Sequence, residues 1–166
     1  MPSIDGLGHV GIFVDDMQRQ RDFYTRVLGL AIADEDLDMD VGGSDGDSKG
    51  ICFLSASPDN EHHELVLMGG RKSDNATRVV QQISFKVPSV DDLRDYYHRL
   101  QNENVTFQNI TSHGNALGLY FADPEGNTVE LYYKTGFNVP QPHGKPIDLD
   151  DSTEDLLAFA KSFETN

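Results

Sequence analysis

Alternating apolar and polar residues mark two similar strand-and-helix segments in the chain. Residues 10–14 alternate with period two, and residues 23–30 then place apolar side chains at helical spacing. About 73 residues later, residues 82–87 alternate in the same way, and residues 93–100 form another helical stripe. A repeat of this kind predicts two modules of similar fold.

Each half continues with segments that have the composition of strands. An acidic segment from residue 34 to 49 reads as a strand interrupted by an exposed loop. The order in each module is strand, helix and three strands. The sequence therefore predicts an α+β fold of two tandem βαβββ modules that form an open, trough-like mixed sheet. The other strands are expected at residues 51–56, 63–68, 105–110, 117–122 and 127–133.

The modules are expected to share one domain over residues 1–136. Module one spans about residues 5–69 and module two about residues 79–135. Residues 69–77 are polar and rich in turn-forming residues, which is typical of a linker.

Residues 137–166 are predicted to form a C-terminal arm and a short helix. The helix is expected to start at Ser152 and to carry Leu156, Leu157 and Phe163 on one side. This apolar side has no partner within its own repeat. We expect it to pack on the rim of the trough or against a second subunit, which favours a homodimer.

Charge and cysteine content exclude several classes of function. The 166 residues include 28 Asp and Glu against 13 Lys and Arg, for a formal charge of −15. Such a chain repels nucleic acid and anionic membranes. The single cysteine, Cys52, excludes an internal disulfide, and no apolar run reaches the length of a membrane span. These features predict a cytoplasmic protein.

Four polar side chains interrupt the apolar pattern at matched strand positions in the two modules. His9 opposes the apolar face of residues 10–14, and Gln82 does the same in the second copy. Glu64 and Glu130 precede or interrupt apolar residues of the closing strands. All four are expected to face away from the helices and into the trough, where they would form a divalent-metal site.

Three segments of the sequence resemble the vicinal oxygen chelate superfamily. They are Gly-His-Val-Gly-Ile at residues 8–12, the segment at residues 82–87, and the hairpin Asp-Pro-Glu-Gly-Asn-Thr-Val-Glu-Leu at residues 123–131. The superfamily contains glyoxalase I, extradiol ring-cleavage dioxygenases, and fosfomycin and bleomycin resistance proteins. The resemblance covers residues 5–135 and is strongest to small extradiol-dioxygenase-like members.

The dioxygenase resemblance implies a metal site of His9, Gln82 and Glu130. Extradiol enzymes hold Fe(II) through two histidines and one glutamate and leave positions open for a catechol and dioxygen. Gln82 departs from this pattern, because the family has histidine at that position. The implied substrate is a small aromatic or vicinal-oxygen compound.

Three further residues resemble those that assist ring cleavage in extradiol dioxygenases. His63 matches a histidine that moves protons beside the metal. His113 and Tyr120 match residues that contact the catecholate and the ring-opened intermediate. Each also has a structural interpretation, since His113 precedes a turn glycine and Tyr120 lies in an apolar strand.

Two alternatives to the dioxygenase remain open. Glyoxalase I uses four protein ligands around Zn(II) or Ni(II), and His9, Glu64, Gln82 and Glu130 reproduce such a set with the modules exchanged. The third interpretation is a metal-free binding protein of the bleomycin-resistance type, in which Gln82 marks the loss of the metal. Fe(II) is favoured as the cofactor, with Zn(II), Ni(II) or Mn(II) as the other candidates.

Overall fold

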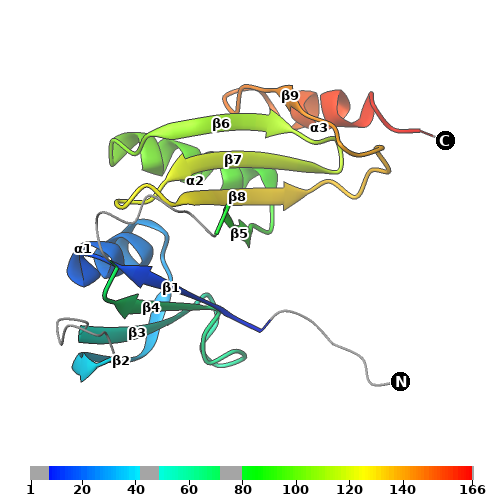
Figure 1. Ribbon diagram of the computed structural model, residues 1–166. Helices are drawn as coiled ribbons and strands as arrows, with labels where there is room; N and C mark the ends of the chain where they lie inside the picture. Colours follow the sequence, from blue (N-terminus) through cyan, green and yellow to red (C-terminus); the bar gives the residue numbers. More distant parts are fainter. Residues whose placement is uncertain (1–7, 42–48, 72–79, 166) are drawn as a thin grey trace, which may run out of the picture. The chain divides into compact units, whose positions relative to one another are not determined.

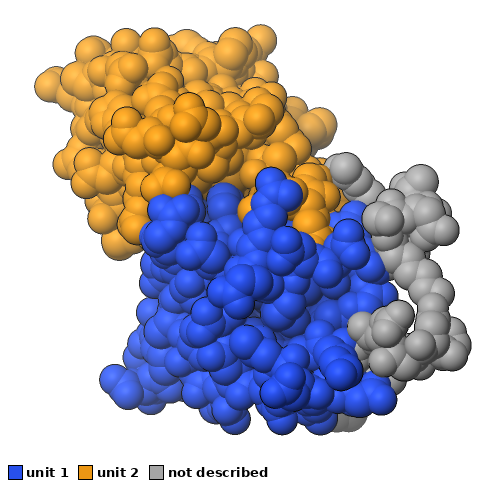
Figure 2. Space-filling view, turned by 90° about the vertical axis from the view of Figure 1, so that its left-hand side faces the viewer, with its two compact units in different colours: residues 1–78 blue, residues 79–166 orange. Residues whose placement is uncertain are grey.

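The structure is a computed structural model that describes residues 8–41, 49–71 and 80–165. The chain divides into two compact units, residues 1–78 and 79–166 (Figure 2). Most of the predicted linker and part of the acidic loop fall outside the described residues. The C-terminal arm and helix belong to the second unit.

Unit 1 contains the strand order β1-β4-β3-β2 (Figure 1). Strand β1 runs parallel to β4, whereas the β4–β3 and β3–β2 pairs are antiparallel. The helical segment between β1 and β2 buries apolar side chains of the unit. The elements are β1 (Val10–Val14), α1 (Met17–Asp22), η1 (Phe23–Val27), β2 (Ala31–Asp40), β3 (Lys49–Ser55) and β4 (Leu65–Gly69).

The predicted first helix is not one regular α-helix. It begins as α1, capped by the Asp16 side chain, and continues as the π-helical segment η1. The amide of Leu28 donates to the carbonyl of Phe23, five residues earlier, at 3.2 Å. This wider turn accommodates Phe23 and Tyr24, which are 6% and 0% exposed. Apolar spacing alone does not distinguish the two helix types, so the sequence predicted only that a helix is present.

Unit 2 repeats the arrangement with the strand order β5-β8-β7-β6-β9. Strand β5 is parallel to β8, and the remaining neighbours are antiparallel. The predicted α+β fold of two βαβββ modules is confirmed, and β9 is an addition from the arm. The elements are β5 (Ile83–Lys86), α2 (Val90–Asn102), β6 (Phe107–Ser112), β7 (Ala116–Ala122), β8 (Thr128–Lys134), β9 (Lys145–Pro146) and α3 (Thr153–Lys161).

Helix α2 covers one face of the unit 2 sheet. Its N-cap is Ser89, whose hydroxyl accepts from the amide of Asp92 at 3.0 Å. Its residues Leu93 and Leu100 are fully buried. None of the helices in the described ranges is long and apolar enough to cross a membrane.

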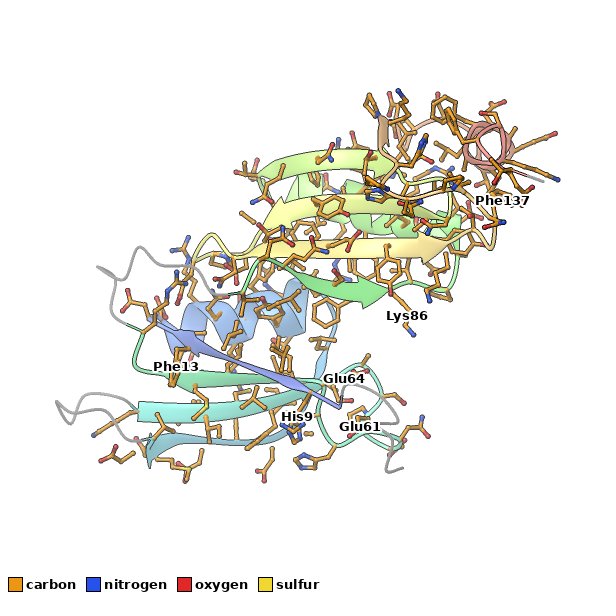
Figure 3. The ribbon with its side chains drawn as sticks, turned by 45° about the vertical axis from the view of Figure 1, so that its right-hand side comes forward. His9, Phe13, Glu61, Glu64, Lys86 and Phe137 are labelled. Carbon is orange, nitrogen blue, oxygen red and sulfur yellow. The ribbon has the colours of Figure 1, made fainter. Side chains whose placement is uncertain are left out.

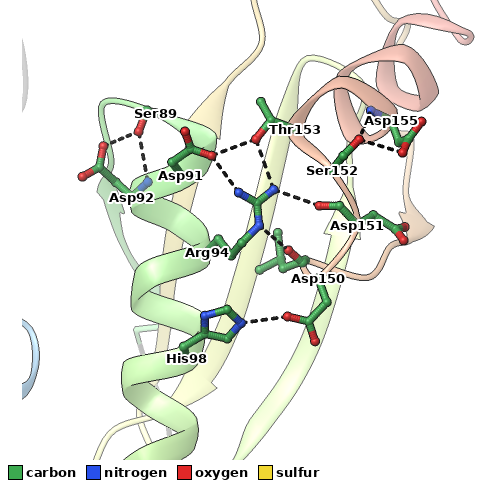
Figure 4. A network of polar contacts seen from close by, with 11 residues as sticks. Ser89, Asp91, Asp92, Arg94, His98, Asp150, Asp151, Ser152, Thr153 and Asp155 are labelled. Carbon is green, nitrogen blue, oxygen red and sulfur yellow. Dashed lines mark hydrogen bonds and ion pairs between the residues drawn. The ribbon is translucent and has the colours of Figure 1, made fainter.

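Helix α3 is held to α2 by the guanidinium of Arg94 (Figure 4). This group donates to the carbonyls of Leu149 and Asp151, both at 2.8 Å. It also contacts the Thr153 hydroxyl at 3.1 Å and the Asp91 carboxylate at 2.7 Å. One planar cation therefore fixes the chain that leads into α3.

The apolar side of α3 packs on its own unit. Leu156 and Ala160 are 2% and 0% exposed, while Phe159 on another side is 40% exposed. Packing within the chain thus accounts for the buried part of the helix. The homodimer remains a prediction.

Replacing Arg94 with Lys should lower the free energy of unfolding by about 1–3 kcal/mol, since an ammonium does not span these four acceptors. Chemical denaturation measures the change. Arg26→Lys is the control, because Arg26 makes an exposed pair with Asp22 at 3.3 Å and should change stability by less than about 0.5 kcal/mol. Equal effects of the two substitutions would contradict a special role for Arg94.

Candidate functional site

In unit 1, His9 and Glu64 lie next to each other at the start of two parallel strands (Figure 3). Each residue directly precedes its strand, β1 or β4, and the Val10 amide donates to the Glu64 carbonyl at 3.0 Å. The ring of His63 packs against His9, with ring centroids 4.3 Å apart. The predicted residues of module one therefore gather at one end of its sheet.

The Glu64 carboxylate has a structural partner within unit 1. Its Oε2 accepts from the amide of Ala56 at 2.7 Å, just after β3 ends. The bond ties the turn after β3 to the start of β4. A carboxylate used in this way has one acceptor oxygen committed to the fold.

His63 lies in a cluster of aromatic rings. Phe53 packs at 4.9 Å between centroids, and the Nδ1 atoms of His62 and His63 are 2.8 Å apart. Burial, followed by the neighbouring rings of His9 and His62, lowers the pKa of His63. The lowered pKa favours the uncharged ring, which is the form that accepts a proton.

In unit 2, Glu130 lies within β8 and is only 7% exposed. Its Oε2 accepts from the Gln82 amide at 2.9 Å and from the Ser84 hydroxyl at 2.6 Å. Ser84 stands directly opposite Glu130 in the β5–β8 register, and Gln82 directly precedes β5. Strand pairing therefore brings residues 48 positions apart into one polar cluster.

Tyr120 extends this cluster across β7. It stands directly opposite Glu130 in the β7–β8 register, so its phenol lies beside the carboxylate. Burial, with a further contribution from Glu130, raises the pKa of Tyr120 well above its usual value. The phenol hydroxyl also lies 2.9 Å from Nε2 of His113. Glu130, Tyr120 and His113 thus form a connected chain of polar groups.

Gly118 provides the space that Tyr120 occupies. A Cβ atom built on Gly118 would lie 2.9 Å from the Tyr120 ring and 3.0 Å from Oε1 of Glu130. Any side chain at this position would push on both members of the cluster. The glycine is therefore required by close packing at the site.

The donor set around Glu130 fits a divalent cation. The hydrogen bonds from Gln82 and Ser84 come from neutral groups, and no Lys or Arg within the described ranges forms an ion pair with Glu130. A nearly buried carboxylate without a counter-cation is costly, and a bound cation would relieve that cost. The amide oxygen of Gln82, the atom through which an amide would bind a metal, takes no part in these bonds.

The expected ligands come from both units and include an amide. In the portion of the chain described, no cluster of three His, Cys, Asp or Glu residues is arranged to hold a metal ion. The expected set of His9, Gln82 and Glu130 contains only two residues of those types, because Gln82 is an amide. It remains a prediction.

Sequence reasoning missed three parts of the site. Ser84 lies two residues after Gln82, so strand alternation placed it on the same face. Gly118 lies two residues before Tyr120 and carried the same signal. The backbone carbonyl of His143, which lies 2.7 Å from Nδ1 of His113, had no sequence signal because it depends on the path of the arm.

Comparison with known proteins identifies the family. Residues 6–131 match the Glyoxalase/Bleomycin resistance protein/Dioxygenase superfamily, and the chain belongs to it. Members of this superfamily act on small molecules, and enzymes are among them.

One similar protein is biphenyl-2,3-diol 1,2-dioxygenase 3 of Rhodococcus globerulus. It is 28% identical over 130 residues, which cover 75% of this chain and 61% of the relative. The chain therefore spans less than two thirds of the length of this curated relative. The match agrees with the resemblance to extradiol dioxygenases.

Two solved structures share the fold at lower identity. The fosfomycin resistance protein FosX of Listeria monocytogenes, in complex with Mn(II) and sulfate, has a TM-score of 0.59 and 18% identity, covering 79% of this chain and 93% of that one. The trypanothione-dependent glyoxalase I of Leishmania major has a TM-score of 0.59 and 23% identity, covering 78% and 87%. The fold is therefore shared with an Mn(II)-bound resistance protein and with a glyoxalase I.

Replacing Gly118 with Ala should destabilise the protein by about 1–3 kcal/mol, because the added methyl overlaps the Tyr120 ring and crowds Glu130. Thermal or chemical unfolding measures the loss. Gly11→Ala is the matched control in β1, where the nearest atom to the new Cβ is 3.8 Å away. A Gly118→Ala protein as stable as Gly11→Ala would show that Tyr120 does not need this space.

Proposed function

We propose that the protein is an Fe(II)-dependent, extradiol-type dioxygenase that acts on a small catechol. Its metal ligands would be His9, Gln82 and Glu130. The observation that carries the proposal is the nearly buried Glu130, surrounded by neutral donors and joined through Tyr120 to His113. The similarity to a biphenyl-2,3-diol dioxygenase supports the same chemistry.

Fe(II), when bound, would supply coordination positions for the two oxygens of a catechol and for dioxygen. The protein's contribution is orientation and proton handling. Glu130 is held in one position by its hydrogen bonds to Gln82 and Ser84. A ligand fixed in this way loses little further freedom when it binds a cation.

Proton transfer would involve His63 of unit 1 and the pair Tyr120 and His113 of unit 2. The uncharged ring of His63 is suited to take a hydroxyl proton from the incoming catechol. Tyr120 is protonated at neutral pH, and its raised pKa keeps it so in more alkaline solution, so its hydroxyl can turn from His113 to donate to a developing oxyanion. His113, whose Nε2 lies 2.9 Å from that hydroxyl, is placed to accept its hydrogen bond and hold the phenol in position.

The ring of Phe53 beside His63 favours an aromatic substrate. Phe53 packs against the rings of His62 and His63 with centroids 5.7 and 4.9 Å away. Aromatic side chains stack readily on flat ring substrates.

Replacing Gln82 with His should tighten Fe(II) binding and raise ring cleavage, because imidazole is a stronger ligand for Fe(II) than a neutral amide oxygen. Protein reconstituted with Fe(II) under anaerobic conditions is mixed with catechols in air, and the yellow ring-opened product is followed by absorbance. Gln108→His on β6 is the control, since Gln108 is exposed and outside the cluster. If neither the parent nor Gln82→His bound a divalent metal, the metal-free binding protein would be the better interpretation.

A glyoxalase-type isomerase is the second candidate, favoured by the adjacent positions of His9 and Glu64 before the starts of β1 and β4. It would use Glu64 as a fourth ligand. The bond from the Ala56 amide to Glu64 argues instead for a structural carboxylate.

Glu64→Ala separates the two candidates. The dioxygenase proposal predicts that this variant keeps its iron and its ring-cleaving activity, with a loss of stability of about 1–2 kcal/mol from the unpaired Ala56 amide. Metal analysis and the product assay measure both effects. Loss of the metal together with all activity in a folded Glu64→Ala protein would favour the four-ligand site.

A further inference from the structure

We propose that the C-terminal arm, residues 137–146, is the positioning element of His113. In this proposal the side chain of Gln141 holds the arm against the backbone of His113 by a hydrogen bond. The backbone carbonyl of His143 then fixes the tautomer of the His113 ring. The importance of that tautomer for catalysis rests on the proposed function, whereas the tautomer itself is a property of the folded chain.

The contact between the arm and the ring determines where the proton lies. Nδ1 of His113 is 2.7 Å from the carbonyl oxygen of His143, and a carbonyl only accepts hydrogen bonds. Nδ1 therefore carries a proton. The opposite nitrogen, Nε2, faces the Tyr120 hydroxyl at 2.9 Å. In the uncharged ring Nε2 is then the acceptor, and the phenol donates to it.

The side chain of Gln141 holds the arm in the position that this bond needs. Its Nε2 donates to the carbonyl of His113 at 2.8 Å and to that of Val139 at 3.2 Å. Its Oε1 accepts from the amide of His143 at 3.2 Å. One amide group thus joins the backbone of His113 to the backbone of His143, the residue that orients the ring.

The turn after His113 is shaped to receive the arm. Gly114 has a φ of +73°, and a Cβ atom there would lie 2.5 Å from the side chain of Val139. The carbonyl of Gly114 accepts from the Thr135 hydroxyl at 2.6 Å. Val139 is 6% exposed, so the arm is packed into the unit at this point.

The segment that follows helix α3 supports the arm from its other side. The rings of Phe163 and His143 lie 4.3 Å apart, and the amide of Asn138 donates to the Glu164 carboxylate at 3.1 Å. Because Arg94 holds the start of α3 on α2, the arm is fastened at both ends. This arrangement gives the C-terminal segment a role at the site beyond covering the sheet.

The tautomer is measured directly by ¹⁵N NMR of histidine-labelled, metal-free protein. Long-range ¹H–¹⁵N spectra distinguish a ring protonated at Nδ1 from one protonated at Nε2. We expect His113 of the parent to be protonated at Nδ1. In Gln141→Ala and Gln141→Glu, which lose the donor to His113, we expect the signal to move toward Nε2 protonation or a mixture. Gln108→Ala and Gln108→Glu, at an exposed position of β6, should leave it unchanged.

Two results would overturn the proposal. One is an Nε2-protonated His113 in the parent protein, and the other is an unchanged tautomer in both folded Gln141 variants. With Fe(II) and a catechol, the Gln141 variants should lose roughly tenfold in kcat with KM within about twofold. Unchanged kcat despite a changed tautomer would refute the catalytic part. A parent without any ring cleavage would refute the proposed function, and the tautomer result would still decide the role of the arm.

Discussion

The arrangement of unit 2 centres on a carboxylate removed from water that forms no ion pair with a basic side chain among the residues the structure describes. Glu130 is 7% exposed and accepts hydrogen bonds from an amide and a serine hydroxyl, and the uncharged phenol of Tyr120 lies beside it. Desolvating such a group is unfavourable, and neutral donors offset only part of the cost. The proposed function gives this charge a use. Binding of a divalent cation is the use that the family, the amide oxygen of Gln82 and the phenol of Tyr120 all support.

The duplicated fold explains why the polar residues occur where they do. In both units the first and last strands of the module are parallel neighbours, so residues at the strand starts become adjacent. His9 meets Glu64 in this way, and Ser84 meets Glu130. The two glutamates differ in their hydrogen-bond partners. The Glu64 carboxylate accepts from the backbone amide of Ala56, whereas the Glu130 carboxylate accepts from side-chain donors. The same topology thus supplies one pair with a structural glutamate and one pair suited to a cation.

Sequence reasoning worked best where the chemistry follows strand alternation. The period-two pattern placed Glu130 opposite buried neighbours, and the structure confirms Val129 and Leu131 in the core. Alternation does not specify which distant residues meet. The contacts of His113 with Tyr120 and with the His143 carbonyl depend on strand register and on an arm that returns 30 residues later. The π-helical turn at Phe23 was missed for a similar reason, because tertiary packing rather than apolar spacing selects it.

The most direct test of the account is a crystal structure of the protein grown with Fe(II) in the absence of oxygen. The account predicts one iron ion bound by a nitrogen of His9, the amide oxygen of Gln82 and the carboxylate of Glu130, with Glu64 still bonded to the Ala56 amide. An ion bound by Glu64 in addition would indicate the four-ligand site. A Glu130 carboxylate that still accepts only its neutral hydrogen-bond donors at saturating Fe(II) would contradict the central claim.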